Sequence, residues 1–399
     1  MAPTGQVLHD LARVLVARGH EVGVIASRRS YDGGGRYPAV EDVDGVHVRR
    51  LRAFGFGRRG LGRVADYASF MAGAVFEALV RQPRPDVVLS LTTPPYIALV
   101  GRALARWRRT AQVQWIMDLY PDALLAHGLL SEGWLLAALR RLSRWQLAGA
   151  DLVLALGPFM EQAVGRYAAA ARRLTSVPLW GGGESVQPEA AGRLRAEGGW
   201  GKGDLVLMYS GNMGLGHRFG EFFEAARQLG PEGPVWAFAG SGPRRAEVES
   251  FVSARSGARV QLLDYVPRER LPASLASADV HLVSLRRAWQ GLIVPSKLQG
   301  VFAVGRPVIF VGPESNEIAY WIKESGGGWV VPEDDVAGLI RAVDQARDVA
   351  ERVRRGQAAL AYAREHFDRQ KNCEAIARLI ESAAQRAARA GSVESAPVS

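Results

Sequence analysis

The sequence has a single cysteine, Cys373, among its 399 residues. One cysteine excludes an internal disulfide framework and a cysteine-based metal cluster, and such scarcity is typical of proteins in a reducing compartment. The longest uncharged apolar stretch, residues 87–101, contains two prolines and is too short to span a bilayer as a helix. Residues 1–10 lack the basic start and the apolar centre of a signal peptide. These absences predict a protein of the cytoplasm.

Length and charge indicate how the chain is divided. A chain of 399 residues is too long for one ordinary hydrophobic core, so we expect two domains. The net charge of +10 is uneven, because residues 1–180 hold 23 arginines against 14 acidic residues, whereas residues 181–399 hold 27 basic and 26 acidic ones. The first half is therefore expected to face an anionic partner: a membrane, a phosphorylated substrate or a nucleic acid.

Short apolar runs alternate with longer helical segments along most of the chain. The runs predict strands at 21–26, 46–51, 86–91, 112–118, 151–156, 204–210, 235–240, 260–266, 279–284 and 307–312. Near-continuous hydrophobicity is typical of parallel strands that are buried on both faces. The crossover helices are predicted at 6–18, 217–228, 242–256 and 333–352. With a Gly- and Pro-rich linker at 177–192, the pattern predicts two doubly wound α/β domains and a cleft between them.

The first predicted helix, which begins near Thr4, should follow a strand and a glycine-bearing loop. No strand-like run precedes it in the sequence. Either the domain lacks this central strand or the sequence is an N-terminal truncation, and we favour the truncation.

Two glycine-bearing loops follow predicted strands, at the end of a parallel sheet where ligands bind. The loop at 209–222, "YSGNMGLGHRFGEF", permits close backbone approach, and His217 and Arg218 add cationic or donor groups, which would suit a diphosphate. The loop at 238–249 repeats the theme with Gly240 and Gly242. For both loops the alternative is a tight turn that needs glycine and binds nothing.

A third stretch places a hydroxyl and a lysine at a predicted helix start. Ser296 is the expected N-cap, and Lys297 would lie in the first turn. A lysine is unfavourable there unless an anion is bound, so its presence argues for a phosphate ligand, with a solvated lysine as the alternative. Gly305 is expected to end this helix and Pro307 to open the next strand.

These stretches together resemble a known family. The runs "RGHEVGVIAS", "YSGNMGLGH", "FAGSGP", "LDYVPRERLPASLASADVHLVSL" and "SKLQGVFAVGRPVIFVGPESNEIA" keep its order and spacing. From Thr4 to about residue 385 the chain resembles the retaining glycosyltransferases of family GT4, of the O-antigen, capsule and colanic-acid type. The resemblance implies the GT-B fold, with two Rossmann-like domains at 1–180 (acceptor) and 181–365 (nucleotide-sugar). It also implies a helix at 366–390 that crosses back to the first domain, before a disordered tail at 391–399.

The resemblance also implies roles for individual residues. The donor base would lie near the backbone of Tyr265 and Val266, and Gly5 would offer N–H groups near the sugar phosphate. Asp118 matches the polar residue that lines the transfer site, although an aspartate that only caps the turn after a strand is the alternative. The remaining donor contacts are expected from Ser210, Gly211, Asn212, Arg218, Gly240, Ser296 and Lys297. Of these residues, Asp118, Arg218 and Lys297 are the expected catalytic ones.

Two departures from the family pattern concern the donor. The family's Glu-x7-Glu motif falls on Leu292 and Gly300, so ribose recognition is expected from elsewhere, with Glu317 as a guess. The usual Arg and Lys of the first phosphate loop read as Asn212 and Arg218, and Lys297 is expected to compensate for the lost cation.

No metal or other cofactor is expected. The Asp-x-Asp at 42–44 precedes Gly45 and a predicted strand, which favours a solvated turn. No other cluster of His or carboxylate residues has the spacing of metal ligands. Cationic side chains and helix ends can neutralise a leaving diphosphate without a metal.

Two basic, amphipathic segments at 49–80 and 134–149 would suit anionic lipid headgroups. The alternative is that core-facing helices carry solvated arginines, and nucleic-acid binding is not expected. We therefore expect a peripheral enzyme on the inner face of the plasma membrane. It would transfer a hexosyl or acetamidosugar group from a nucleotide diphosphate-sugar, most simply a UDP-sugar, to a polyprenyl-diphosphate-linked saccharide. The alternatives are a nucleotide-sugar epimerase of the same fold and a non-catalytic basic binding protein.

Overall fold

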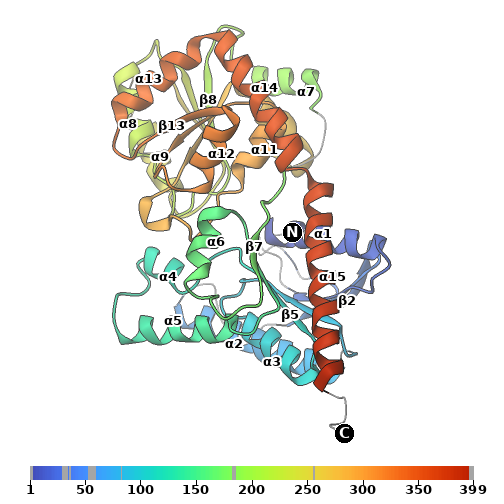
Figure 1. Cartoon of the computed structure of the whole chain (residues 1–399). Helices are drawn as coiled ribbons and strands as arrows, with labels where there is room; N and C mark the ends of the chain where they lie inside the picture. Colours follow the sequence, from blue (N-terminus) through green and yellow to red (C-terminus); the bar gives the residue numbers. More distant parts are fainter. Residues whose placement is uncertain are drawn as a thin grey trace. The chain divides into compact units, whose positions relative to one another are not determined.

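The computed structural model describes residues 3–28, 35, 37–52, 60–81, 83–181, 186–254 and 257–394. Contacts divide the chain into two compact units (Figure 1). The first unit comprises Met1–Pro121, Ser131–Val177 and Gln370–Ser399, and the second comprises Asp122–Leu130 and Pro178–Arg369. The short segment Asp122–Leu130, which the sequence places in the first half, therefore belongs by its contacts to the second unit.

The strands of the first unit form two sheets. Four parallel strands lie in the order β4 (Val87–Ser90), β5 (Ala111–Trp115), β6 (Leu152–Ala155) and β7 (Leu174–Ser176). The other sheet has the order β1 (Gly23–Ser27), β3 (Val46–Leu51) and β2 (Val40–Val43). β5 and β6 are buried along their whole length, as their continuous apolar character predicts. Strand β2 was not expected; it makes the Asp-x-Asp part of a hairpin, with the turn at Asp44 and Gly45.

The helices of the first unit are α1 (Pro3–Ala17), α2 (Gly60–Phe76), the π-helical η1 (Glu77–Arg81), α3 (Ala98–Arg108), α5 (Trp134–Leu147), α6 (Pro158–Gly165) and α15 (Arg369–Glu394). No strand precedes α1 among the described residues. The last helix, α15, packs Cys373 and Ile376 into the core, and its Glu381 pairs with Arg18 at 2.8 Å and with His20 at 2.9 Å. It continues from an Ala-rich run to Glu394, so residues 391–394 are helical rather than part of an unstructured tail. Residues 395–399 lie outside the described part.

The second unit is a six-stranded parallel sheet in the order β10 (Val260–Leu263), β9 (Val235–Ala239), β8 (Val206–Ser210), β11 (Val280–Ser284), β12 (Val308–Val311) and β13 (Gly328–Val331). Strands β9 and β10 lie on one side of β8 in the sheet, and β11, β12 and β13 lie on the other side. The strand order therefore reverses between β8 and β11, which is the point where open α/β sheets bind ligands.

Helices cover both faces of this sheet (Figure 1). They are α7 (Pro188–Glu197), α8 (Gly220–Leu229), α9 (Arg245–Ser253), α10 (Leu271–Ser277), α11 (Lys297–Ala303), α12 (Glu317–Ser325), α13 (Val336–Arg347) and α14 (Val349–His366), with 3₁₀ turns η2 (Arg268–Arg270) and η3 (Arg287–Trp289). The short helix α4 (Asp122–Ala126), which also belongs to this unit, contacts η3. Phe222 of α8, Phe251 of α9 and Leu339 of α13 share one core with alternate residues of β8, which places these three helices on one face. The single helix predicted at 333–352 is wrong, because Asp348 interrupts it and caps α14 by accepting from Ala350 N–H.

None of the helices in the described part of the chain combines the length and the apolar composition needed to cross a membrane.

Candidate active site

The loop after β8 borders the switch point of the second unit, and glycines let it pack against the loop after β9. A Cβ on Gly240 would lie 2.2 Å from the carbonyl oxygen of Gly211, and one on Gly242 would lie 2.7 Å from that of Met213. Both glycines also have positive φ angles, +134° and +146°. Close loop packing thus accounts for Gly240 and Gly242 without a ligand. A donor contact for Gly240 stays a prediction.

The β8–α8 loop presents backbone N–H groups that have no protein partner. Gly211 N–H is used within the fold, because it donates to Ala239. Within the described residues, however, the N–H groups of Asn212, Gly214 and Leu215 make no hydrogen bond. All three residues are at least partly exposed, and unpaired backbone N–H groups in a loop before a helix are the kind of donor that binds anions.

Lys297, the first residue of α11, reaches across to this loop. Its Nζ lies 2.8 Å from Nε2 of His217 and 3.3 Å from the carbonyl oxygen of Asn212, and 4.8 Å from the centre of the Tyr209 ring. A Cβ on Gly211 would lie 2.7 Å from Lys297 Cε, so this route needs a glycine at 211. Burial lowers the pKa of Lys297 to about 7. The lysine is therefore directed onto the loop, and a phosphate ligand for it stays a prediction.

His217 lies under the Lys297 amine and is buried. Its Nδ1 is 2.6 Å from the carbonyl oxygen of Ser284, at the end of β11. Burial and the nearby charge of Lys297 lower the pKa of His217 to about 3, so the imidazole is neutral at physiological pH. His217 was expected to add a cationic or donor group for a ligand, but its ring faces the lysine.

Arg218 is engaged elsewhere. Its guanidinium pairs with Glu221 at 2.6 Å, with Glu333 at 3.7 Å and with Asp334. Its backbone N–H donates to the Ser284 hydroxyl at 2.9 Å. The structure therefore brings Lys297, Gly211 and Asn212 together, whereas Arg218 is neutralised by carboxylates. A catalytic role for Arg218 stays a prediction, and an anion would have to compete with three acidic side chains for it.

Other expected donor contacts are placed around the same end of the sheet. Ser210 ends β8, and Ser296 occupies the N-cap position of α11. Ser296 makes no capping bond, because its backbone is already nearly helical (φ −76°, ψ 7°), so that part of the expectation is wrong. Strand β10 ends three residues earlier than expected, so Tyr265 and Val266 both lie in the loop that follows it. Tyr265 is 58% exposed there.

Two further expected residues belong to other helices. Glu317 begins α12 beside its capping residue Asn316 and is only 1% exposed, so its carboxylate is hardly accessible to a ribose. Gly5 lies in the first turn of α1, in the first unit. Both roles stay predictions. Gly305, with φ +69°, follows α11, and Pro307 directly precedes β12, as expected.

Asp118 follows β5 in the first unit. Its backbone N–H donates to the Thr92 hydroxyl at 3.1 Å, and its side chain borders a cavity of about 20 Å³ shared with Tyr96 and Tyr120. Burial raises the pKa of the Asp118 carboxyl to about 6. A carboxylate with such a pKa is ionised at neutral pH and basic enough to accept a proton.

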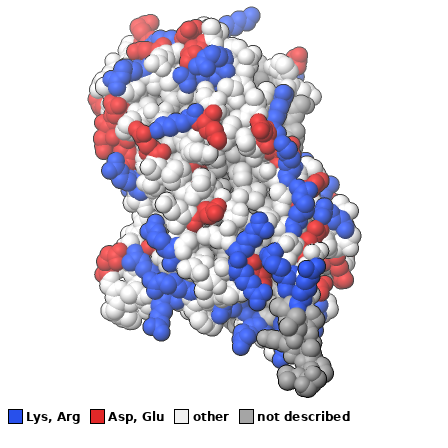
Figure 2. Space-filling model, in the orientation of Figure 1, with Lys and Arg blue, Asp and Glu red and all other residues white. Residues whose placement is uncertain are grey.

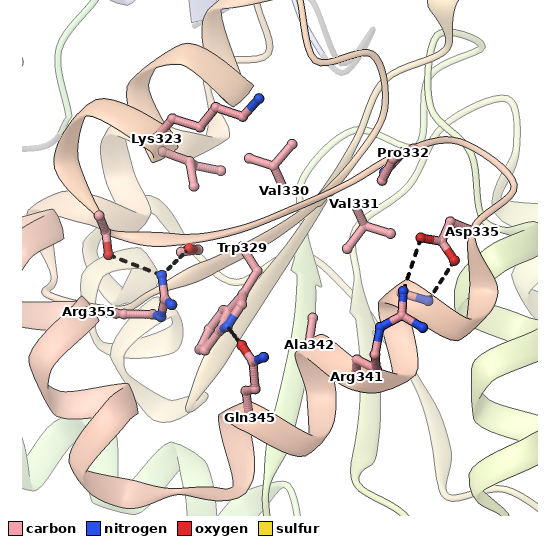
Figure 3. Close-up of a pocket in the computed structure, with 14 residues that line it drawn as sticks. Lys323, Trp329, Val330, Val331, Pro332, Asp335, Arg341, Ala342, Gln345 and Arg355 are labelled. Carbon is pink, nitrogen blue, oxygen red and sulfur yellow. Dashed lines mark hydrogen bonds and ion pairs between the residues drawn. The ribbon is translucent and has the colours of Figure 1, made fainter.

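A larger groove of about 470 Å³ follows the edge strand β13, between α12, α13 and α14 (Figure 3). None of the expected site residues lines it. Its polar groups satisfy one another: Trp329 donates to Gln345 at 2.7 Å, Arg355 donates to the Gly328 carbonyl, and Arg341 pairs with Asp335 at 3.6 Å. A groove with mutually paired groups gives no sign of a specific ligand.

The surface of the first unit is rich in arginine; its part of Figure 2, in the lower half of the view, carries more blue than red. On α5, Trp134, Arg141 and Trp145 follow one another at helical spacing, and all three are exposed. In the other basic segment, Arg49 pairs with Glu77 and Arg50 with Glu41. Residues 53–59 of that segment lie outside the described part.

In the part of the chain that the structure describes, no three His, Cys, Asp or Glu side chains lie close enough to share a metal ion.

Comparison with known proteins places these features in context. Residues 4–180 match the family described as "Glycosyl transferase 4-like domain", and residues 204–348 match "Glycosyl transferases group 1". The probable glycosyltransferase WbjE of Pseudomonas aeruginosa is 28% identical over 294 residues, which cover 72% of this chain and 71% of WbjE. The putative colanic acid biosynthesis glycosyl transferase WcaI of Escherichia coli K12 is 25% identical over 360 residues, covering 86% and 88%.

Among solved structures, the Anabaena protein HepE in complex with UDP and glucose matches with a TM-score of 0.68 at 16% identity, over 96% of both chains. This likeness confirms the predicted architecture of two Rossmann-like α/β domains.

Proposed function

The chain is a glycosyltransferase of family GT4 with the GT-B fold, and from this premise we propose that it transfers a sugar from a nucleoside diphosphate donor to a saccharide acceptor with retention of configuration. The observation that carries the proposal is the Lys297 ammonium, held over a loop with free N–H groups at the switch point. HepE, with the same fold, binds UDP and glucose, and the name of WcaI refers to colanic acid. These names support a UDP-sugar donor and a role in cell-surface polysaccharide biosynthesis.

The chemistry follows from where charge develops. As the bond between sugar and diphosphate breaks, negative charge grows on the leaving oxygen. Lys297 and the N–H groups of Asn212 and Gly214 would stabilise that charge, and the absence of a side chain at Gly211 leaves room for the Lys297 side chain to reach the loop. Arg218 would join them if the donor displaced one of its carboxylate partners. These groups would act in place of a metal ion, so activity should persist in EDTA.

Asp118 would act on the acceptor. We propose that its carboxylate orients the acceptor hydroxyl or accepts its proton, for which a pKa near 6 is well suited. We propose a polyprenyl-diphosphate-linked saccharide as the acceptor, since the arginine-rich first unit favours an anionic, lipid-bound molecule.

The exposed face of α5 would hold the enzyme at the inner surface of the plasma membrane. Trp134 and Trp145 would insert at the level of the headgroups, and Arg141 would pair with anionic lipid. Vesicle sedimentation tests this: the chain should bind phosphatidylglycerol vesicles and not phosphatidylcholine vesicles. A double variant with Trp134→Ser and Trp145→Ser should bind at least several-fold more weakly, whereas Val349→Ser, at a 61% exposed apolar residue of the second unit, should bind normally. Equal binding by the double variant would refute this surface.

The experiment that tests the function is a donor screen with the full chain. UDP-, GDP- and dTDP-sugars are incubated with and without vesicles that carry polyprenyl-diphosphate saccharides, and the released nucleoside diphosphate and the product anomer are measured. The proposal expects release that depends on the acceptor, with an unchanged anomeric configuration. Conversion of the donor sugar without an acceptor would indicate an epimerase instead, and no binding of any nucleotide would indicate a non-catalytic protein.

A further inference from the structure

His217 sits between two groups whose chemistry fixes its state. The Ser284 carbonyl oxygen, 2.6 Å from Nδ1, can only accept a hydrogen bond, and the Lys297 amine, 2.8 Å from Nε2, can only donate in its protonated form. A neutral imidazole carries one hydrogen. That hydrogen must therefore be on Nδ1, which leaves the lone pair of Nε2 facing the lysine.

The same contacts account for the three hydrogens of the ammonium. One is directed to His217 Nε2 and one to the carbonyl oxygen of Asn212, at 3.3 Å. Within the described residues, the Lys297 amine has no third hydrogen-bonding partner, and the Tyr209 ring lies 4.8 Å away. The third N–H therefore remains available to a ligand, and its direction is set by the two bonds that are already made.

We infer that His217 is a positioning residue, which holds the Lys297 amine over the β8–α8 loop so that its free N–H meets the donor diphosphate. His217 is itself held from below by β11, and Arg244 donates to its backbone carbonyl oxygen. The inference rests on the proposed function, because it gives His217 a role within the proposed donor site. The role of His217 is to limit the motion of the long, flexible Lys297 side chain before the donor binds.

The tautomer can be read directly by ¹⁵N NMR of the full chain labelled at histidine, without any substrate. The expected spectrum shows His217 with a protonated Nδ1 and an unprotonated Nε2, unchanged between pH 5.5 and 8. A hydrogen on Nε2, or titration of the ring within this range, would overturn the inference whether or not the chain is a transferase.

Two variants test whether His217 positions the Lys297 amine or only packs against it. His217→Gln places an acceptor oxygen near the position of Nε2, whereas His217→Asn keeps a donor for Ser284 and loses the contact to Lys297. We expect inorganic pyrophosphate to bind His217→Asn about 10-fold more weakly than the wild type, the effect of losing a hydrogen bond to a charged group. His217→Gln should stay within about 3-fold of the wild type, by the same reasoning.

The outcomes of this comparison are distinct. Wild-type affinity in the Asn variant, or equal losses in both variants, would overturn the inference. Failure of the wild type to bind either pyrophosphate or UDP would refute the proposed function, and the tautomer measurement would still decide the state of His217.

Discussion

Replacing Lys297 by methionine separates the function of this residue from its cost to the fold. Methionine keeps an unbranched side chain of similar length and removes the ammonium that contacts His217 and Asn212. We expect the variant to lose donor binding and sugar transfer while the folded state becomes more stable. Such opposite effects are typical of a residue that is retained for function at the expense of stability.

The magnitudes follow from the buried charge. Loss of one preorganised electrostatic group typically lowers kcat by about 10²- to 10³-fold, or about 2.7–4 kcal/mol. For stability, the pKa of Lys297 is about 7 in the folded chain, against a usual value of 10.5. The folded state thus binds this proton less tightly than the unfolded state. Folding bears the full cost of burying the charge below pH 7, and the cost falls as pH rises from 7 to 10.5. Lys297→Met should gain on the order of 1–3 kcal/mol at pH 6, and little at pH 10.

The assay combines calorimetric titration with UDP at pH 6.5 with thermal unfolding at pH 6 and pH 10. Lys323→Met is a matched control in the same unit, because Lys323 is 52% exposed and pairs with Glu314 at the surface. The control should keep UDP binding and change stability by at most a few tenths of a kcal/mol, as exposed ion pairs do. UDP binding by Lys297→Met at wild-type strength would refute the role of the ammonium. A loss of stability at pH 6 would refute the reasoning about its burial.

Three further predictions concern Gly211, Asp118 and the Lys297 amine. Gly211→Ala would place a Cβ 2.7 Å from Lys297 Cε at a φ of +131°. This variant should lower the free energy of unfolding by about 1–3 kcal/mol and weaken pyrophosphate binding. Gly203→Ala, where no atom lies within 4 Å of the added Cβ, should do neither. Asp118→Asn should lower kcat by about 10²- to 10⁴-fold. Wild-type kcat should fall below pH 6 as the Asp118 carboxylate gains a proton, and a pH profile without this acidic limb would contradict its role. Because a bound diphosphate raises the pKa of Lys297, UDP binding above pH 7 should take up a proton, and the affinity should fall about 10-fold per pH unit. Calorimetry in buffers of different ionisation enthalpy measures this uptake. Equal heats in all buffers would show that no proton is taken up.

Much of the fold could be predicted because buried parallel strands have continuous apolar runs in their sequence. All ten predicted strands are present, with ends shifted by a few residues. The three missed strands lack that signal: β2 reads Val-Glu-Asp-Val, β7 has three residues, and β13 begins within a glycine run at 326–328. Their strand conformation comes from pairing with a neighbour, which local sequence does not encode.

The site could be predicted only in part. Lys297 and the loop at 209–222 were both expected at a diphosphate, since parallel strands bring their carboxyl ends to one edge of a sheet. The contact between Lys297 and His217 joins residues 80 positions apart and depends on the path of a side chain past Gly211, so spacing could not reveal it. Similarly, Asp334 lies 116 positions from Arg218, and nothing local showed that this arginine would be paired with acids.

The most direct test of the central claim is a crystal structure of the full chain with UDP. We predict that a diphosphate oxygen lies about 3 Å from Lys297 Nζ, the length of a charge-assisted hydrogen bond, with the N–H groups of Asn212 and Gly214 directed at the same phosphates. A nucleotide bound elsewhere, or a diphosphate that leaves the Lys297 amine in contact only with His217 and Asn212, would contradict the account.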